Sequence, residues 1–138
     1  MANAFTLEVA TPERLLLHEH VLEAQIPAAS GYIGVLKGHA PLLGELGIGG
    51  LKYKKIDGST HDLVVIGGYV EVSNDHVRVL AERAEEVNQI DIGRAEQALK
   101  RANDRLLHPA GGVDIARALN AMKRAQARLD AARRSNHA

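Results

Sequence analysis

The chain has 138 residues, of which 46% are hydrophobic, so it can bury a core in one domain or two small units without disulfides or metal. It has no cysteine, which excludes thiol nucleophiles, thiolate zinc sites and disulfides, and only 3% aromatic residues, which argues against base stacking. The sequence has neither a basic and apolar leader nor the ~18 consecutive apolar residues of a membrane span, so we expect a soluble protein without an export signal.

The formal net charge is zero, but the two parts of the chain carry opposite charges. Residues 1–86 hold 7 basic and 12 acidic side chains, whereas residues 87–138 hold 10 basic and 5 acidic ones. Glycine and β-branched residues dominate the first part, and Ala, Arg and Leu dominate the second. We therefore predict a strand-rich domain over 1–86 and a helical domain over 87–138, with the acidic segment 82–88 as the joint.

The first part is typical of an antiparallel β-sandwich or barrel built from short strands. Alternating apolar residues predict strands over 5–9 and 22–26, and the apolar run 63–66 predicts a strand covered on both faces. Asp57-Gly58 and Asn74-Asp75 each separate two strand-like runs, as hairpin turns do.

Two further groups of residues in this part favour structural roles. Glycines at 47, 49–50 and 67–68 indicate turns or bulges rather than a phosphate loop, because no helix starting with Lys-Ser or Lys-Thr follows them. His18 and His20 would share a strand face, but no third metal ligand accompanies them at a recognisable spacing, so exposed strand residues are the better interpretation.

The second part contains an internal repeat, in which residues 91–106 realign with residues 114–129 and ten of the sixteen positions are identical. Each copy opens with an Asp suited to an N-cap, and Pro109 and Gly111-Gly112 interrupt between the copies. We predict an antiparallel helical hairpin, and hence an α+β fold: an N-terminal antiparallel β-sandwich followed by a C-terminal α-helical hairpin. The facing stripes would consist of Ile92, Ala95, Leu99, Ala102 and Leu106 in one helix and Ile115, Ala118, Met122, Ala125 and Leu129 in the other.

Such thin, Ala-rich stripes bury little area, so the two helices would pack weakly against each other and depend on contacts with neighbouring parts for stability. A few kcal/mol of binding free energy would then suffice for a ligand to determine whether the hairpin stays folded. Its other faces carry eight basic side chains, six of them Arg, which favours bidentate recognition of carboxylate or phosphate over a merely solvated face. These are Lys100, Arg101, Arg105, Lys123, Arg124, Arg128, Arg133 and Arg134.

Three motifs in this order resemble the epsilon subunit family of bacterial F-type ATP synthases, and the resemblance covers the whole chain. They are the loop Gly38-His39-Ala40-Pro41, the strand entry 67–72 and the hairpin start 90–95. The resemblance implies a ten-stranded β-sandwich that docks on the gamma subunit and on the rotor ring of membrane c subunits, with that loop at the subunit interface. Tyr32 departs from the pattern, because many relatives carry an acid there that would contact the ring.

The same resemblance implies a noncatalytic, peripheral subunit at the cytoplasmic face of the bacterial membrane, within a proton-translocating complex. It implies a mobile hairpin that hinders ATP hydrolysis when it extends toward acidic segments of the catalytic alpha/beta head. A subunit of this family would require no cofactor, but in some relatives a motif like 90–95 helps to bind ATP as a regulatory ligand, with or without magnesium. The matching residues here are Glu85, Ile90, Asp91, Arg94, Ala95, Arg101, Arg124 and Arg128.

Residue chemistry suits such a site. Arg94 and Arg101 lie two helical turns apart, and Arg124 and Arg128 one turn apart, so a folded hairpin could bring four guanidinium groups toward one triphosphate. The alternative is that Asp91 only caps its helix and pairs with Arg94, a contact worth ~0.2–0.5 kcal/mol.

No Ser-His-acid arrangement, paired catalytic carboxylates or Walker loop appears in the sequence, so we do not expect an enzyme. Two functions compete: a regulatory rotor subunit, and a free-standing adaptor whose basic hairpin binds nucleic acid or an acidic protein. We expect no nucleic-acid partner, because the hairpin segment is only +5 and lacks aromatic residues.

Overall fold

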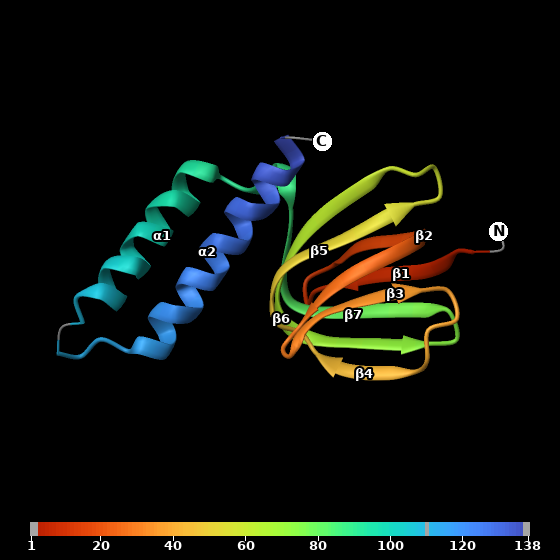
Figure 1. Cartoon of the computed structure of the whole chain (residues 1–138), viewed down its shortest axis with the longest axis horizontal. Coiled ribbons are helices and arrows are strands. Elements are labelled where there is room, and N and C mark those ends of the chain that lie inside the picture. Colours follow the sequence, from red (N-terminus) through yellow and green to blue (C-terminus); the bar gives the residue numbers. More distant parts are fainter. Residues whose placement is uncertain (1–2, 110, 137–138) are drawn as a thin grey trace.

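The structure is a computed structural model that describes residues 3–109 and 111–136. An all-β body comes first and two helices follow it, as the sequence predicts (Figure 1). The elements are β1 (Phe5–Ala10), β2 (Leu15–Ala28), β3 (Gly31–Leu36), β4 (Leu42–Glu45), β5 (Ile48–Lys55), β6 (Thr60–Ser73), β7 (His76–Glu86), a 3-10 turn η1 (Val87–Gln89), α1 (Ile92–Leu107) and α2 (Ile115–Asn136). No helix in the described ranges is long and apolar enough to cross a membrane.

The strands form a sheet in the order β1-β7-β6-β5-β2-β3, with β4 paired to β6. Because β1 also pairs with β2, the sheet folds back on itself into a sandwich. The resemblance implied ten strands, whereas the described residues form seven. Two long strands account for part of the difference, because β2 and β6 have 14 residues each, and β6 pairs first with β5 and then with β4.

The predicted hairpin turns are confirmed. Asn74 and Asp75 both have a positive φ, of 51° and 58°, as a two-residue turn between antiparallel strands requires, and Gly58 has a φ of 88°. The long strand β6 bends at Gly67-Gly68, where both glycines have a positive φ and a side chain on Gly68 would collide with the backbone of Leu80. The pairing register of β6 with β7 is unbroken across this pair, so the two glycines bend the strand without the extra residue of a bulge.

The sandwich core lies between the two layers and is built from large aliphatic side chains, among which Leu7, Ile26 and Leu51 are completely buried. The run 63–66 is covered on both faces, as predicted. Leu63 and Val65 belong to the sandwich core, whereas Val64 and Ile66 face a second apolar cluster outside it. That cluster is completed by Ala127 and Ala131 of α2, with Ile48, Val87 and Ile90 at its edge.

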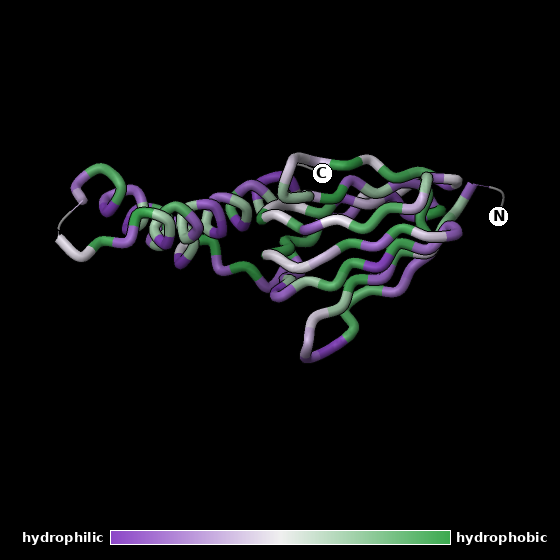
Figure 2. The backbone as a smooth tube through the Cα atoms, turned by 90° about the horizontal axis from the view of Figure 1, so that it is seen from below, coloured by the Kyte–Doolittle hydropathy of each residue, from purple (hydrophilic) through white to green (hydrophobic). Residues whose placement is uncertain are grey.

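The two helices form an antiparallel hairpin that projects from one end of the sandwich, with α2 against β5 and β6 (Figure 1). Along the hairpin, hydrophilic and hydrophobic residues alternate over its whole length (Figure 2). Asp91 and Asp114 cap their helices as predicted, since each side chain accepts the backbone N–H three residues on, at 3.0 and 3.1 Å.

The buried stripe of the hairpin is thin. Its centre consists of Ala95 and Ala102 from α1 and Ala118 and Ala125 from α2, all at most 4% exposed. Ile92 and Ile115 were predicted to join this stripe but are 40% and 48% exposed. Each is the first residue of its helix, so no preceding helical turn covers it.

Candidate functional site

A cavity of about 410 Å³, called here the junction cavity, opens where the end of β7 and η1 meet both helices. It is lined by seven of the eight residues that the resemblance associates with ATP. They are Glu85 of β7, Asp91 at the N-cap of α1, Arg94, Ala95 and Arg101 of α1, and Arg124 and Arg128 of α2. The structure thus brings together side chains from β7, α1 and α2, among which Glu85 and Arg128 are 43 residues apart in the sequence.

Ile90, the eighth residue, does not line the junction cavity. Its side chain packs instead against the apolar cluster of Val64, Ile66 and Ala127, beneath the start of α1. Its backbone N–H donates to the carbonyl of Val87 at 3.1 Å and closes the 3-10 turn. In this position Ile90 fixes where α1 begins rather than presenting a group to a ligand.

An ion pair between β7 and α2 crosses one wall of the cavity. Nη2 of Arg128 lies 2.7 Å from Oε1 of Glu85, and its Nε donates to the same oxygen at 2.8 Å. Both side chains are about three-quarters buried, so this pair is screened less than a surface pair would be. It ties the hairpin to the sandwich directly beside the arginine cluster.

The other arginines of the junction cavity, Arg83, Arg94, Arg101 and Arg124, make no ion pair among the described residues. Burial lowers the pKa of the Arg124 guanidinium, and the nearby charges of Arg83, Arg128 and Arg117 lower it further. These four guanidinium groups therefore concentrate positive charge here that no ion pair among the described residues offsets. A polyanion with several acceptor oxygens would relieve that repulsion.

Oδ1 of Asp91 accepts the backbone N–H of Arg94, which is the expected helix-capping contact. No ion pair joins the Asp91 and Arg94 side chains within the described part of the chain. The capping role is thus present, and the Arg94 guanidinium is not tied up by its own cap.

Three lining residues were missed by the sequence reasoning: Arg83, Gln89 and Ala98. Arg83 stands two residues before Glu85 on β7, and this strand spacing places both on one face, so alternation could have found it. Ala98 lies one helical turn beyond Arg94, a signal that helical spacing also carried. The side-chain oxygen of Gln89 accepts the N–H of Glu86 at 3.1 Å, and no local pattern in the sequence predicts its place in the cavity.

The predicted interface loop lies between β3 and β4 and is held by its own contacts. Gly38 has a φ of 84°, and its N–H donates to Oδ1 of Asp75 in the β6–β7 turn at 2.7 Å. The ring of His39 lies with Nδ1 2.7 Å from the carbonyl oxygen of Ala40. Leu36 and Leu43 flank the loop with 61% and 74% of their surface exposed. The role of Gly38, His39, Ala40 and Pro41 at a subunit interface stays a prediction.

A larger cavity of about 760 Å³ lies where the last turns of α2 meet the sandwich. Nε of Arg134 lies 3.4 Å from Oδ1 of Asp62 on β6, a second ion pair between the two bodies. Tyr53 stacks on His61, with ring centroids 5.4 Å apart, and burial together with Glu19, Glu86 and Asp62 raises the pKa of Tyr53. No sequence motif predicted this cavity.

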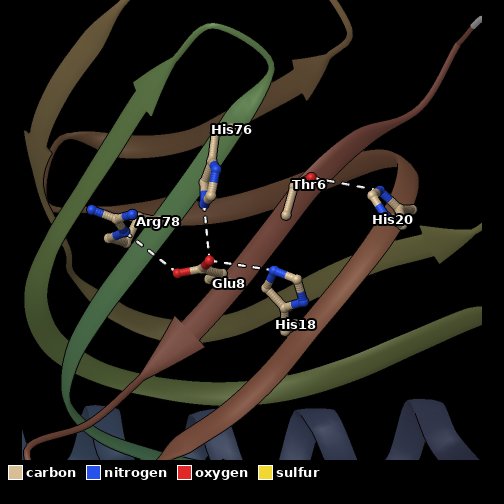
Figure 3. Close-up of polar contacts among 6 residues, drawn as sticks. All are labelled: Thr6, Glu8, His18, His20, His76 and Arg78. Carbon is tan, nitrogen blue, oxygen red and sulfur yellow. Dashed lines mark hydrogen bonds and ion pairs between the residues drawn. The ribbon is translucent and has the colours of Figure 1, made fainter.

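A third polar cluster lies on the outward face of β1 (Figure 3). Oε1 of Glu8 is 3.1 Å from Nε2 of His76 and 3.4 Å from Nε2 of His18, and its Oε2 is 3.4 Å from Nε of Arg78. The cluster joins β1 to β2 and β7, and His18 and His20 are exposed strand residues, as predicted. Among the residues described, no three His, Cys or acidic side chains are placed to hold a metal ion.

Both parts of the chain match families of known proteins. Residues 4–87 match the β-sandwich domain of the ATP synthase delta/epsilon chain, and residues 88–133 match its long α-helix domain. The chain is 56% identical over 132 residues to the ATP synthase epsilon chain of Solibacter usitatus, which covers 96% of this chain and 98% of that one. It is 45% identical over 106 residues to that of Koribacter versatilis, covering 77% and 74%.

Solved structures show the same arrangement. A chain of the mitochondrial ATP synthase of Euglena gracilis, solved with the OSCP, F1 and c-ring parts, superposes with a TM-score of 0.82 at 25% identity, covering 94% of this chain and 81% of that one. A chain from the central stalk and c-ring of the Tetrahymena thermophila enzyme has a TM-score of 0.53 at 14% identity over 94% of both chains, which shows a shared fold.

Proposed function

The chain belongs to the delta/epsilon family of ATP synthase subunits and is a noncatalytic epsilon subunit, and we propose that it acts in the complex as both a link and a brake. The sandwich links the gamma subunit to the rotor ring of c subunits, at the cytoplasmic face of the bacterial membrane. The hairpin, when it leaves the sandwich, reaches acidic segments of the catalytic alpha/beta head and hinders ATP hydrolysis. Membership of this family favours these roles over a free-standing adaptor.

ATP is the ligand that holds the hairpin in its folded position. The observation that carries this proposal is the make-up of the junction cavity, whose walls come from the sandwich as well as from both helices. Arg83 and Glu85 remain with the sandwich when the hairpin leaves, whereas Arg94 and Arg124 go with it. A ligand that needs all of these groups binds only the docked form and therefore stabilises it, by about 2.7 kcal/mol at a concentration 100 times its Kd.

The docked form is held weakly enough for such a ligand to matter. The apolar contact between hairpin and sandwich rests on Ala127 and Ala131, which bury little area against Val64 and Ile66. Two ion pairs add to it, Arg128 with Glu85 and Arg134 with Asp62. Release therefore costs a few kcal/mol, within the range that ligand binding or contact with the catalytic head can supply.

Calorimetry of the isolated chain with ATP and magnesium tests the nucleotide part of the proposal. We expect measurable binding by the parent protein and a loss of at least about tenfold in affinity for Arg94→Ala, because a charged hydrogen bond to phosphate is removed. Lys100→Ala is the matched control, since it removes the same charge from the same helix outside the junction cavity. If the parent protein gives no heat with ATP, the nucleotide proposal fails.

A further inference from the structure

The internal repeat gives the hairpin an approximate twofold symmetry, which the structure preserves in detail. Ala95 and Ala102 of α1 are buried to the same extent as their repeat counterparts Ala118 and Ala125 of α2, at 4% and 1% exposure in each helix. The two caps also correspond, since Asp91 and Asp114 accept N–H groups at nearly equal distances. A feature at one end of the hairpin therefore has a counterpart at the other.

The junction cavity has such a counterpart. A cavity of about 520 Å³, called here the distal cavity, lies at the turn end of the hairpin, between the last turns of α1 and the start of α2. Six of the seven hairpin residues that line the junction cavity have their repeat counterpart in the lining of the distal one. Those counterparts are Asp114, Arg117, Ala118, Ala121, Arg124 and Arg105.

The two cavities differ in how their charge is compensated. In the junction cavity, Arg128 is neutralised by Glu85 from the sandwich. Arg105, the repeat counterpart of Arg128, has no acid partner among the described residues, and neither has Arg117. The lining of the distal cavity holds three arginines and a single acid, Asp114, whose Oδ1 is engaged in the helix cap.

We propose that the distal cavity is a second anion site, which binds a polyphosphate chain through Arg105, Arg117 and Arg124. Guanidinium groups recognise phosphate oxygens in pairs, and a chain of phosphates offers acceptors to all three. Glu85 lies outside the repeat and has no counterpart here, so this site holds no sandwich carboxylate beside the ligand. It therefore takes the phosphates of a nucleotide and inorganic polyphosphate alike. The proposal goes beyond the role of ATP at the junction cavity and does not depend on it.

Arg124 lines both cavities and makes the two sites interdependent. Its neighbours on the junction side are Arg83 and Arg128, and its neighbour on the distal side is Arg117, and all three lower the pKa of its guanidinium. A ligand that engages Arg124 from one side leaves less positive charge for a ligand on the other. The second polyphosphate therefore binds more weakly than the first.

The test is a titration of the isolated full-length chain with sodium tripolyphosphate, followed by calorimetry and by backbone amide NMR. We expect two sites, with the shifts of the weaker one centred on residues 114–118. Arg117→Ala should remove the weaker site and keep the stronger, Arg94→Ala should do the reverse, and Arg124→Ala should impair both. Arg105→Ala is a second, independent variant of the distal cavity should Arg117→Ala perturb the helix.

Lys123→Ala provides the matched control, because it removes one charge from α2 outside both cavities. It should leave two sites. A single site in the parent protein, a distal titration untouched by Arg117→Ala and Arg105→Ala, or an equal loss in Lys123→Ala would each overturn the proposal.

Parallel titrations with ATP and adenosine separate the possible sources of the ligand. ATP and tripolyphosphate should bind the distal cavity with affinities within a few fold of each other, and adenosine should not shift residues 114–118. A distal site that binds ATP but not tripolyphosphate would contradict recognition of the phosphate chain. If ATP binding depends on Arg94 but no ligand shifts the amides of residues 114–118, the distal site is rejected and the role of ATP at the junction cavity stands. If ligands shift residues 114–118 but no Arg94-dependent ATP binding is found, the proposed role of ATP is rejected and the distal site stands.

Discussion

The sandwich and the hairpin of this subunit are built from different core residues. Among the buried apolar side chains of the described residues, seven of the eight in the two helices are alanine, against two of nineteen in the sandwich. Each buried methylene contributes ~0.8 kcal/mol, so the aliphatic core of the sandwich supplies most of the stability of the chain. We therefore expect the sandwich to be stable on its own, whereas the stability of the hairpin depends on its contacts with other parts.

The difference suits the two tasks that we propose for this subunit. A link in a rotor must transmit force without changing shape, and a tightly packed sandwich does so because its side chains have no room to rearrange. A brake must move between positions, which requires that no single contact be strong. The alanine stripe of the hairpin meets that requirement, and the arginines of the junction cavity that make no ion pair among the described residues suit the proposed anionic ligand.

Removing the hairpin is the largest change that tests this comparison. Deleting everything after Val87 should leave a sandwich that unfolds cooperatively and still assembles into the complex, because its core is independent of the helices. ATP hydrolysis by the complex should then rise several-fold, as measured by steady-state phosphate release against the complex with the full-length chain. Unchanged hydrolysis in a fully assembled complex would count against an inhibitory hairpin.

Leu51→Ala tests the rigid side of the comparison. Leu51 is completely buried between the layers of the sandwich, so its truncation should cost about 2–5 kcal/mol of unfolding free energy. Urea denaturation followed by circular dichroism measures this loss. Leu129 is the one large, fully buried side chain of the helices among the described residues. If Leu129→Ala lowered the free energy of global unfolding as much as Leu51→Ala does, the comparison would be weakened.

Ala131→Leu tests the movable side with a smaller effect. Ala131 is fully buried against Val64 and Ile66, and three added carbons there should oppose docking by about 1–3 kcal/mol without unfolding either body. Amide hydrogen exchange should show faster exchange in α2 and unchanged exchange in the sandwich strands. The control is Ala116→Leu, an exposed position on α2; equal acceleration there would mean that the effect is not one of docking.

The sequence predicted those parts of the fold that depend on local spacing. Asn74-Asp75 and Asp57-Gly58 located two hairpins, and the repeat located both helices and their caps. The strands β3 and β4 were not predicted, because glycine-rich segments have little strand preference of their own and are ordered by pairing with β2 and β6.

For the candidate site, spacing along each helix placed four arginines on suitable faces. It could not show that Arg128 would meet Glu85, 43 residues earlier in the chain, or that Arg83 would join them. Those contacts depend on how α2 lies across the sheet, which is decided by the fit of Ala127 and Ala131 on β6 rather than by any local pattern.

The closure of the sheet through β1 also affects the subunit before it joins its complex. Since β1 bonds to β2 on one side and β7 on the other, the strands of the described sheet that pair with only one neighbour are β3 and β4, which have six and four residues. Long, flat edges recruit other strands and lead to aggregation, and these two are too short and, in β3, too interrupted by Gly31 and Gly34 to do so. The described sheet therefore ends on both sides in a strand too short to serve as a template on which another copy of the chain could add a strand.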